Sequence, residues 1–138
     1  MKNILLKTSF LLFAILFTTE NQAKVNDSEG YAFGYATCLG DSCVYITDIQ
    51  HLNGVSTNKK TGFIELQKEY AHEMELRLKD IYAKHFTCAF FYSTNKKKLE
   101  KKFLSIRKTI NKSKENKLEY ITNDVFSFTP IIVSTQTN

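Results

Sequence analysis

Residues 31–50 are rich in aromatic, β-branched and small apolar side chains, and a polar Gly40-Asp41 pair interrupts them in the middle. Aromatic and β-branched residues favour strands, and a two-residue interruption is typical of a tight turn between antiparallel strands. We therefore expect a β-hairpin made of Tyr31 to Leu39 and Ser42 to Gln50. The polar stretch over 51–61 then predicts a loop.

A two-residue turn sets the register of this hairpin, so that Cys38 faces Cys43 and Ala36 faces Tyr45. Because side chains alternate between the two faces along a strand, the large apolar residues gather on one face. That face is the expected core face, and it carries Tyr31, Phe33, Tyr35, Leu39, Val44 and Ile46. The opposite face is small and flat, and we expect Tyr45 to lie over Gly34 there.

Two later stretches repeat apolar residues at steps of three and four, which is the period of an amphipathic helix. The first predicts a helix over about 62–84 with Gly62 as its N-cap. Its apolar stripe is Phe63, Leu66, Tyr70, Met74, Leu78 and Ile81. The second predicts a helix over about 96–112, which Ser93 or Thr94 caps. Its apolar stripe is Leu99, Phe103, Ile106 and Ile110.

Two further strands complete the pattern. Residues 86–92 form a continuous apolar run, which predicts a central strand buried on both faces. Residues 118–128 predict a last strand with a break at Asn123-Asp124, and residues 131–138 are expected to be an edge segment or a loose tail. The order β-β-α-β-α-β favours an α+β two-layer sandwich. In it, a mixed or antiparallel sheet of about four strands carries both helices on one face.

Residues 1–23 have the features of a cleaved secretory signal peptide. Two early lysines supply positive charge, an apolar block follows over 10–17, and Ala23 is a small residue at the expected cut. Eight apolar residues span about 12 Å as a helix, against roughly 30 Å for a bilayer core, so we expect no transmembrane anchor. The mature protein should then be a single small α+β domain over 24–130 that is periplasmic or secreted.

Charge is distributed unevenly along the chain, whose net charge is +5, or +4 without residues 1–23. Residues 84–117 hold eleven lysines and arginines against Glu100 and Glu115, a net charge of +9. Such a segment attracts anionic partners, and we expect an anionic envelope component or an acidic protein. A groove that binds single-stranded nucleic acid requires aromatic residues between its basic residues, and none interleave with these lysines, so we expect no nucleic-acid partner. The candidate binding residues lie on the second predicted helix: Lys97, Lys98, Lys101, Lys108 and Lys112.

The reactive side chains form no recognisable catalytic or metal-binding motif. Export favours disulfides, so Cys38 and Cys43 are the candidate pair, and Cys88 is left over. The C-x4-C spacing of the pair differs from the C-x-x-C of redox motifs. The three histidines fall on a loop, a helix and a helix end, so we assign no metal ligand, no cofactor and no catalytic residue.

These features favour a non-catalytic exported binding or interaction module, which uses its basic helix to hold an anionic partner. The alternative is a small extracytoplasmic enzyme of hydrolase type without a recognisable motif. A deep pocket lined by histidine, carboxylate or Cys88 would favour the enzyme, whereas a convex charged surface would favour the binding module.

Overall fold

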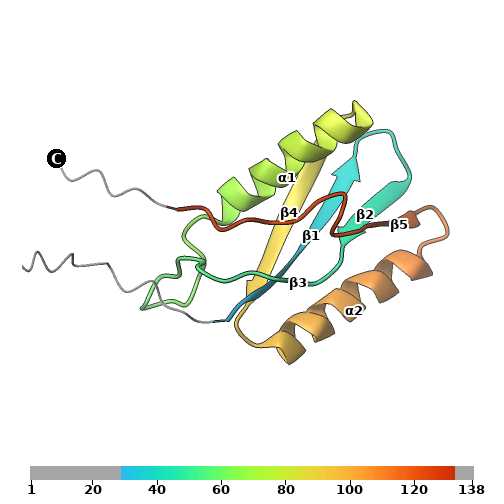
Figure 1. Cartoon of the computed structure of the whole chain (residues 1–138). Coiled ribbons are helices and arrows are strands. Elements are labelled where there is room, and N and C mark those ends of the chain that lie inside the picture. Colours follow the sequence, from blue (N-terminus) through green and yellow to red (C-terminus); the bar gives the residue numbers. More distant parts are fainter. Residues whose placement is uncertain (1–28, 133–138) are drawn as a thin grey trace, which may run out of the picture.

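The computed structural model of the chain describes residues 29–132, which build one sheet and two helices (Figure 1). The predicted signal peptide over 1–23, its cut near Lys24 and most of the predicted tail over 131–138 lie outside the described residues. In chain order the elements are β1 Tyr31–Cys38, β2 Cys43–Thr47, β3 Gln50–His51, α1 Gln67–Tyr82, β4 Phe86–Ser93, α2 Lys96–Lys112 and β5 Lys117–Ile121.

The sheet is open and mixed, with most of its strands antiparallel. Strand β1 pairs with β4 on one side and with β2 and β3 on the other, and β5 lies parallel to β2. The predicted α+β class with a mixed sheet is confirmed. The central position predicted for residues 86–92 is wrong, because among the described strands β4 pairs with β1 alone and forms an edge. The central strand is β1.

The hairpin has the predicted register, with Ala36 opposite Tyr45. Further along, Ala32 pairs with Gln50, so two residues of β1 lie opposite three residues over 47–49. One extra residue on one strand is a β-bulge, which bends that strand. At the bulge the buried Gly34 N–H donates to Thr47 Oγ1 at 2.9 Å, so a side chain supplies the acceptor where the backbone ladder is interrupted.

The prediction that both helices cover one face of the sheet is wrong. On β1, Ala32 and Ala36 belong to the core under α1, whereas Phe33 belongs to a second cluster under α2. Successive side chains of a strand point to opposite faces, so the two helices lie on opposite sides of the sheet. Figure 1 shows this arrangement, with the sheet between α1 and α2.

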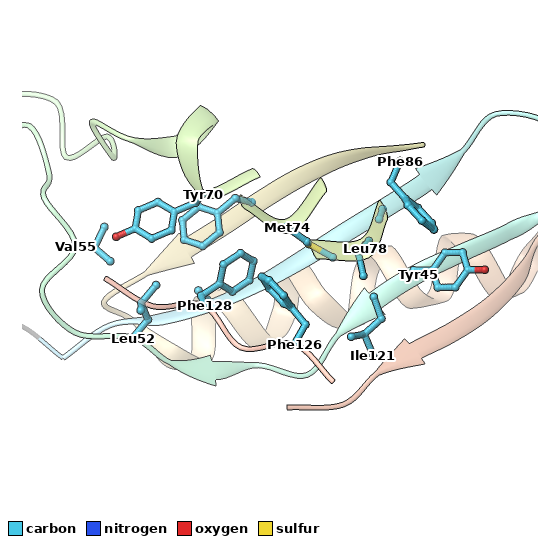
Figure 2. Close-up of a cluster of buried hydrophobic side chains, with 13 residues drawn as sticks. Tyr45, Leu52, Val55, Tyr70, Met74, Leu78, Phe86, Ile121, Phe126 and Phe128 are labelled. Atoms are coloured by element: carbon cyan, nitrogen blue, oxygen red, sulfur yellow. The ribbon is translucent and has the colours of Figure 1, made fainter. Parts of the chain in front are cut away.

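The face with small side chains carries the larger core (Figure 2). A Cβ atom built on Gly34 would lie 2.3 Å from Met74 Sδ and 3.1 Å from Phe128 Cζ, so only glycine allows α1 to approach the sheet this closely. Met74 therefore covers Gly34, where Tyr45 was expected. The Tyr45 ring instead packs edge-on against Phe86, with ring centroids 5.2 Å apart.

A C-terminal strap, residues 122–132, completes the cover of this face. The break predicted at Asn123-Asp124 is present as a turn, but the residues after it form no strand. Phe126 and Phe128 insert between the sheet and α1, where each is less than a tenth exposed. The side-chain amide of buried Gln50 is hydrogen-bonded to the backbone of both residues. Its Nε2 donates to Phe126 O at 3.1 Å, and its Oε1 accepts from the Phe128 N–H at 2.8 Å.

Helix α1, whose N-cap is Leu66, begins four residues later than its apolar stripe predicts. Gly62 has a φ of +70°, and its N–H donates to Asn58 O at 2.7 Å in a tight turn. The Asn58 side chain accepts from two further backbone N–H groups of this turn, which gives the local chain an alternative to a helix. Phe63, an expected member of the apolar stripe, is consequently 72% exposed.

Candidate functional site

Helix α2 has the predicted bounds, and its apolar side holds it on the sheet. Leu99 is buried, and Phe103 and Ile106 pack beside it against a cluster built on Phe33 and Ile46. The Phe33 and Phe103 rings meet edge-on with centroids 5.2 Å apart. This contact fixes which side of the helix faces outward.

The cap of α2 is Asn95, in place of the predicted Ser93 or Thr94. Asn95 Oδ1 accepts from the Lys98 N–H at 3.1 Å, and Ser93 Oγ accepts from the Asn95 N–H at 3.0 Å. A side-chain oxygen at this position satisfies one of the free N–H groups of the first turn, so the basic helix has a defined beginning.

The five candidate lysines are all exposed, and together they form the lysine ridge: Lys97, Lys98, Lys101, Lys108 and Lys112. At 3.6 residues per turn, Lys97, Lys101, Lys108 and Lys112 fall within about 60° of one another around the helix axis, opposite the apolar side. Lys98 lies on the flank, about 100° from Lys97. The structure therefore brings four of the predicted residues into one stripe along the outer surface of α2 and places the fifth beside it.

The other basic residues of α2 are engaged with the rest of the protein. Lys96 Nζ lies 5.6 Å from the centroid of the Tyr31 ring and 3.9 Å from Glu100 Oε1. Lys102 Nζ lies 5.7 Å from the centroid of the Phe91 ring. Lysines of the ridge, by contrast, form no ion pair or cation–π contact with any residue over 29–132.

Arg107, the single arginine of α2, is turned away from the ridge. Its guanidinium carbon lies 5.7 Å from the Phe103 ring centroid and 5.6 Å from that of Tyr120 on β5. Contacts of this kind hold a cation on aromatic faces and fix its position. The outward charge of the helix is therefore carried by lysine alone.

The opposite side of the molecule has a different character. An open hollow of about 460 Å³ lies between α1 and the C-terminal strap, and its lining includes Glu73, Arg77, Asp80 and Asp124. A hydrogen bond from the Thr122 side chain is the main cause that lowers the pKa of Asp124, so this carboxylate stays charged in weak acid. Three carboxylates and one arginine therefore line this hollow, on the side of the sheet opposite the lysine ridge.

The three cysteines are free thiols in the structure. Continuing the hairpin register by one residue places Cys38 opposite Cys43, but no two of the three cysteines lie at disulfide distance. The disulfide between them stays a prediction for oxidising conditions. Burial is the main cause that raises the pKa of Cys88 to about 12, and Glu75 adds to the shift. A thiol held this far from its thiolate form is a poor nucleophile.

Two arrangements that are common in active sites are absent over residues 29–132. No three His, Cys, Asp or Glu side chains there are grouped as a metal site requires. No histidine of this part of the chain is hydrogen-bonded to a Ser, Thr or Cys side chain; His72 contacts Glu75 at 3.4 Å on the exposed side of α1. A second hollow, about 420 Å³ between α2 and β4, has a mainly apolar lining that includes Tyr35, Ala89 and Phe91.

Comparison with protein-family models, with curated proteins and with solved structures gives no match. Among residues 29–132, no helix is both long enough and apolar enough to cross a bilayer. What the protein does must therefore be inferred from its own side chains, of which the lysine ridge is the most distinctive group.

Proposed function

We propose that the protein is a non-catalytic exported binding module, which holds an anionic partner on the lysine ridge of α2. One observation carries this proposal: the ridge lysines are exposed and lack ion-pair or cation–π partners in the described part of the chain, whereas Lys96, Lys102 and Arg107 are all engaged. The partner is an anionic envelope component or an acidic protein.

The ridge has an energetic cost that an anionic partner would offset. Lys97 and Lys101 lie four residues apart, as do Lys108 and Lys112, so like charges face each other along the helix. Such pairs each destabilise a helix by about 0.2–0.5 kcal/mol. An anionic surface would convert this repulsion into attraction, and the effect would fall with salt because exposed charges are screened beyond about 8 Å at physiological ionic strength.

Charge reversal on the ridge tests the proposal. In the first variant, Lys98, Lys101 and Lys108 are replaced by glutamate. In the matched control, the exposed residues Lys59, Lys60 and Lys68 are replaced by glutamate, which changes the net charge by the same amount away from α2. Both variants should remain folded, because exposed substitutions usually change stability by only about 0.5 kcal/mol each.

The readout is the salt concentration that elutes each protein from a heparin column. The ridge variant should elute at much lower salt than the wild-type protein, and the control should elute close to it. Equal elution of the two variants would mean that retention follows net charge alone, and the lysine ridge would then be only a solubilising surface.

A further inference from the structure

An exposed leucine lies in the middle of the lysine ridge. Leu104 is 55% exposed and follows Lys101 by three residues and precedes Lys108 by four. At 100° per residue it falls on the same stripe as these lysines, on the side of α2 that faces away from the sheet. An apolar side chain at this position adds nothing to the binding of a hydrated polyanion, but it can enter an apolar medium.

The cations of the ridge are all lysines, which also bears on the kind of partner. Arginine recognises individual phosphates and carboxylates through a fixed planar fork, whereas lysine acts as a mobile, strongly hydrated point charge. The arginine of α2, Arg107, is held on the rings of Phe103 and Tyr120. The ridge is therefore suited to a surface of diffuse negative charge. A protein partner is less well matched, since lysine is depleted in protein–protein interfaces.

We propose that the anionic partner is a lipid bilayer, on which α2 lies flat with Leu104 inserted below the headgroups. This inference rests on the proposed function. The stripe from Lys97 to Lys112 is about 22 Å long, at 1.5 Å per residue. Long lysine side chains can reach headgroup phosphates while an apolar neighbour is buried, because their own stems are apolar. Each lysine near an anionic bilayer surface should strengthen binding about fivefold.

The sequence offers a clean optical test because it contains no tryptophan. Leu104→Trp introduces a single reporter on the ridge. Leu76→Trp is the matched control, since Leu76 is 51% exposed on α1, at the opposite side of the sheet. Each variant is mixed with vesicles of phosphatidylglycerol and phosphatidylcholine, and with vesicles of phosphatidylcholine alone. Elution from heparin is measured in parallel as a lipid-free readout of the ridge.

The Leu104→Trp emission should shift to the blue with vesicles that contain phosphatidylglycerol, and should not shift with phosphatidylcholine alone. The Leu76→Trp emission should not shift with either. In the tryptophan-free background, Leu104→Gln should weaken binding to the anionic vesicles about fivefold, because a half-exposed leucine loses its contact with lipid, and should leave elution from heparin unchanged.

Three results would overturn the inference. If Leu104→Trp binds heparin in a ridge-dependent manner but shows no shift with anionic vesicles, the bilayer is not the partner and the proposed function stands. If Leu76→Trp shifts as strongly as Leu104→Trp, the protein does not bind the bilayer through α2. A failure of both heparin and vesicle binding would remove the proposed function together with this inference.

Discussion

Replacing Gln50 with leucine should loosen the C-terminal strap and lower the free energy of unfolding by about 3 kcal/mol. Gln50 is 6% exposed, and its side-chain amide is hydrogen-bonded to the backbone of Phe126 and Phe128. Leucine has a similar volume but can neither donate nor accept. The substitution therefore leaves the Phe126 carbonyl and the Phe128 N–H without these partners in a dry environment.

The magnitude follows from the cost of leaving such groups unpaired. A buried donor or acceptor that loses its partner costs about 1–3 kcal/mol, which gives about 2–6 kcal/mol for the two groups. Leucine returns part of this through its greater hydrophobicity, so we expect a value in the lower half of the range. A loss of about 3 kcal/mol is a large share of the 5–15 kcal/mol that is typical for the stability of a protein.

Urea denaturation followed by circular dichroism measures this change, and Gln67→Leu is the matched control. Gln67 also donates from its side chain to a backbone carbonyl, that of Phe90 at 3.0 Å, but the residue is exposed on α1. Water can replace this partner, so the control should lose about 1 kcal/mol or less. Equal and small losses in the two variants would instead show that water reaches the Phe126 and Phe128 backbone, and that the Gln50 hydrogen bonds do not hold the strap.

Three further predictions concern the hairpin, the thiols and the amino terminus. Hydrogen bonds from the Cys43 backbone N–H and from a lysine lower the pKa of Asp41 from 3.8 to about 2. The stability that the Asp41 carboxylate contributes is therefore present above about pH 4 and lost as the pH falls towards 2. Acid unfolding of Asp41→Asn should lack this loss of stability between about pH 4 and pH 2. With its pKa at about 12, Cys88 should resist iodoacetamide at pH 8 until the protein is unfolded. Peptide mapping after oxidation should show a disulfide between Cys38 and Cys43, whereas a disulfide to Cys88 would contradict the hairpin register. Amino-terminal sequencing of exported protein should begin within a few residues of Lys24, and an intact Met1 would contradict the signal peptide.

The hairpin register and the second helix could be predicted because each depends on neighbouring residues. The predicted two-residue turn allows one register for the hairpin, and the structure has that register. The turn itself is centred on Leu39-Gly40, because the Asp41 N–H donates to Cys38 O at 3.1 Å. The regular apolar stripe of Lys96–Lys112, flanked by polar connections, gave bounds that agree with α2. The outward direction of the ridge lysines follows from the same period, so the candidate site was largely predictable.

The placement of the helices was not predictable in the same way. Ala32, Gly34 and Ala36 leave one face of β1 without bulk, which suggested a face away from the core. Small side chains instead let a helix approach closely, and Met74 fills the space above Gly34. The size of the side chains on a strand face therefore did not show which elements pack on it, because side chains of α1 and of the strap fill the space above the small residues.

The packing of the strap against the sheet could not be predicted from the local pattern of apolar and polar residues. Gln50 looks like a polar residue at the end of a strand, and its partners lie 76 and 78 residues further along the chain. The late beginning of α1 has a similar origin. Asn58 and the left-handed Gly62 close a turn that competes with the helix, and the periodicity of apolar residues carries no information about this competition.

Mapping the binding surface by NMR shows directly whether an anionic ligand binds to the lysine ridge. The uniformly labelled protein is titrated with a heparin hexasaccharide, and backbone chemical-shift changes are recorded at low and at high salt. The changes should centre on the exposed side of α2, around Lys101 and Lys108, and should disappear at high salt. Changes that centre on the hollow lined by Glu73, Asp80 and Asp124, or that persist at high salt, would contradict binding through the lysine ridge.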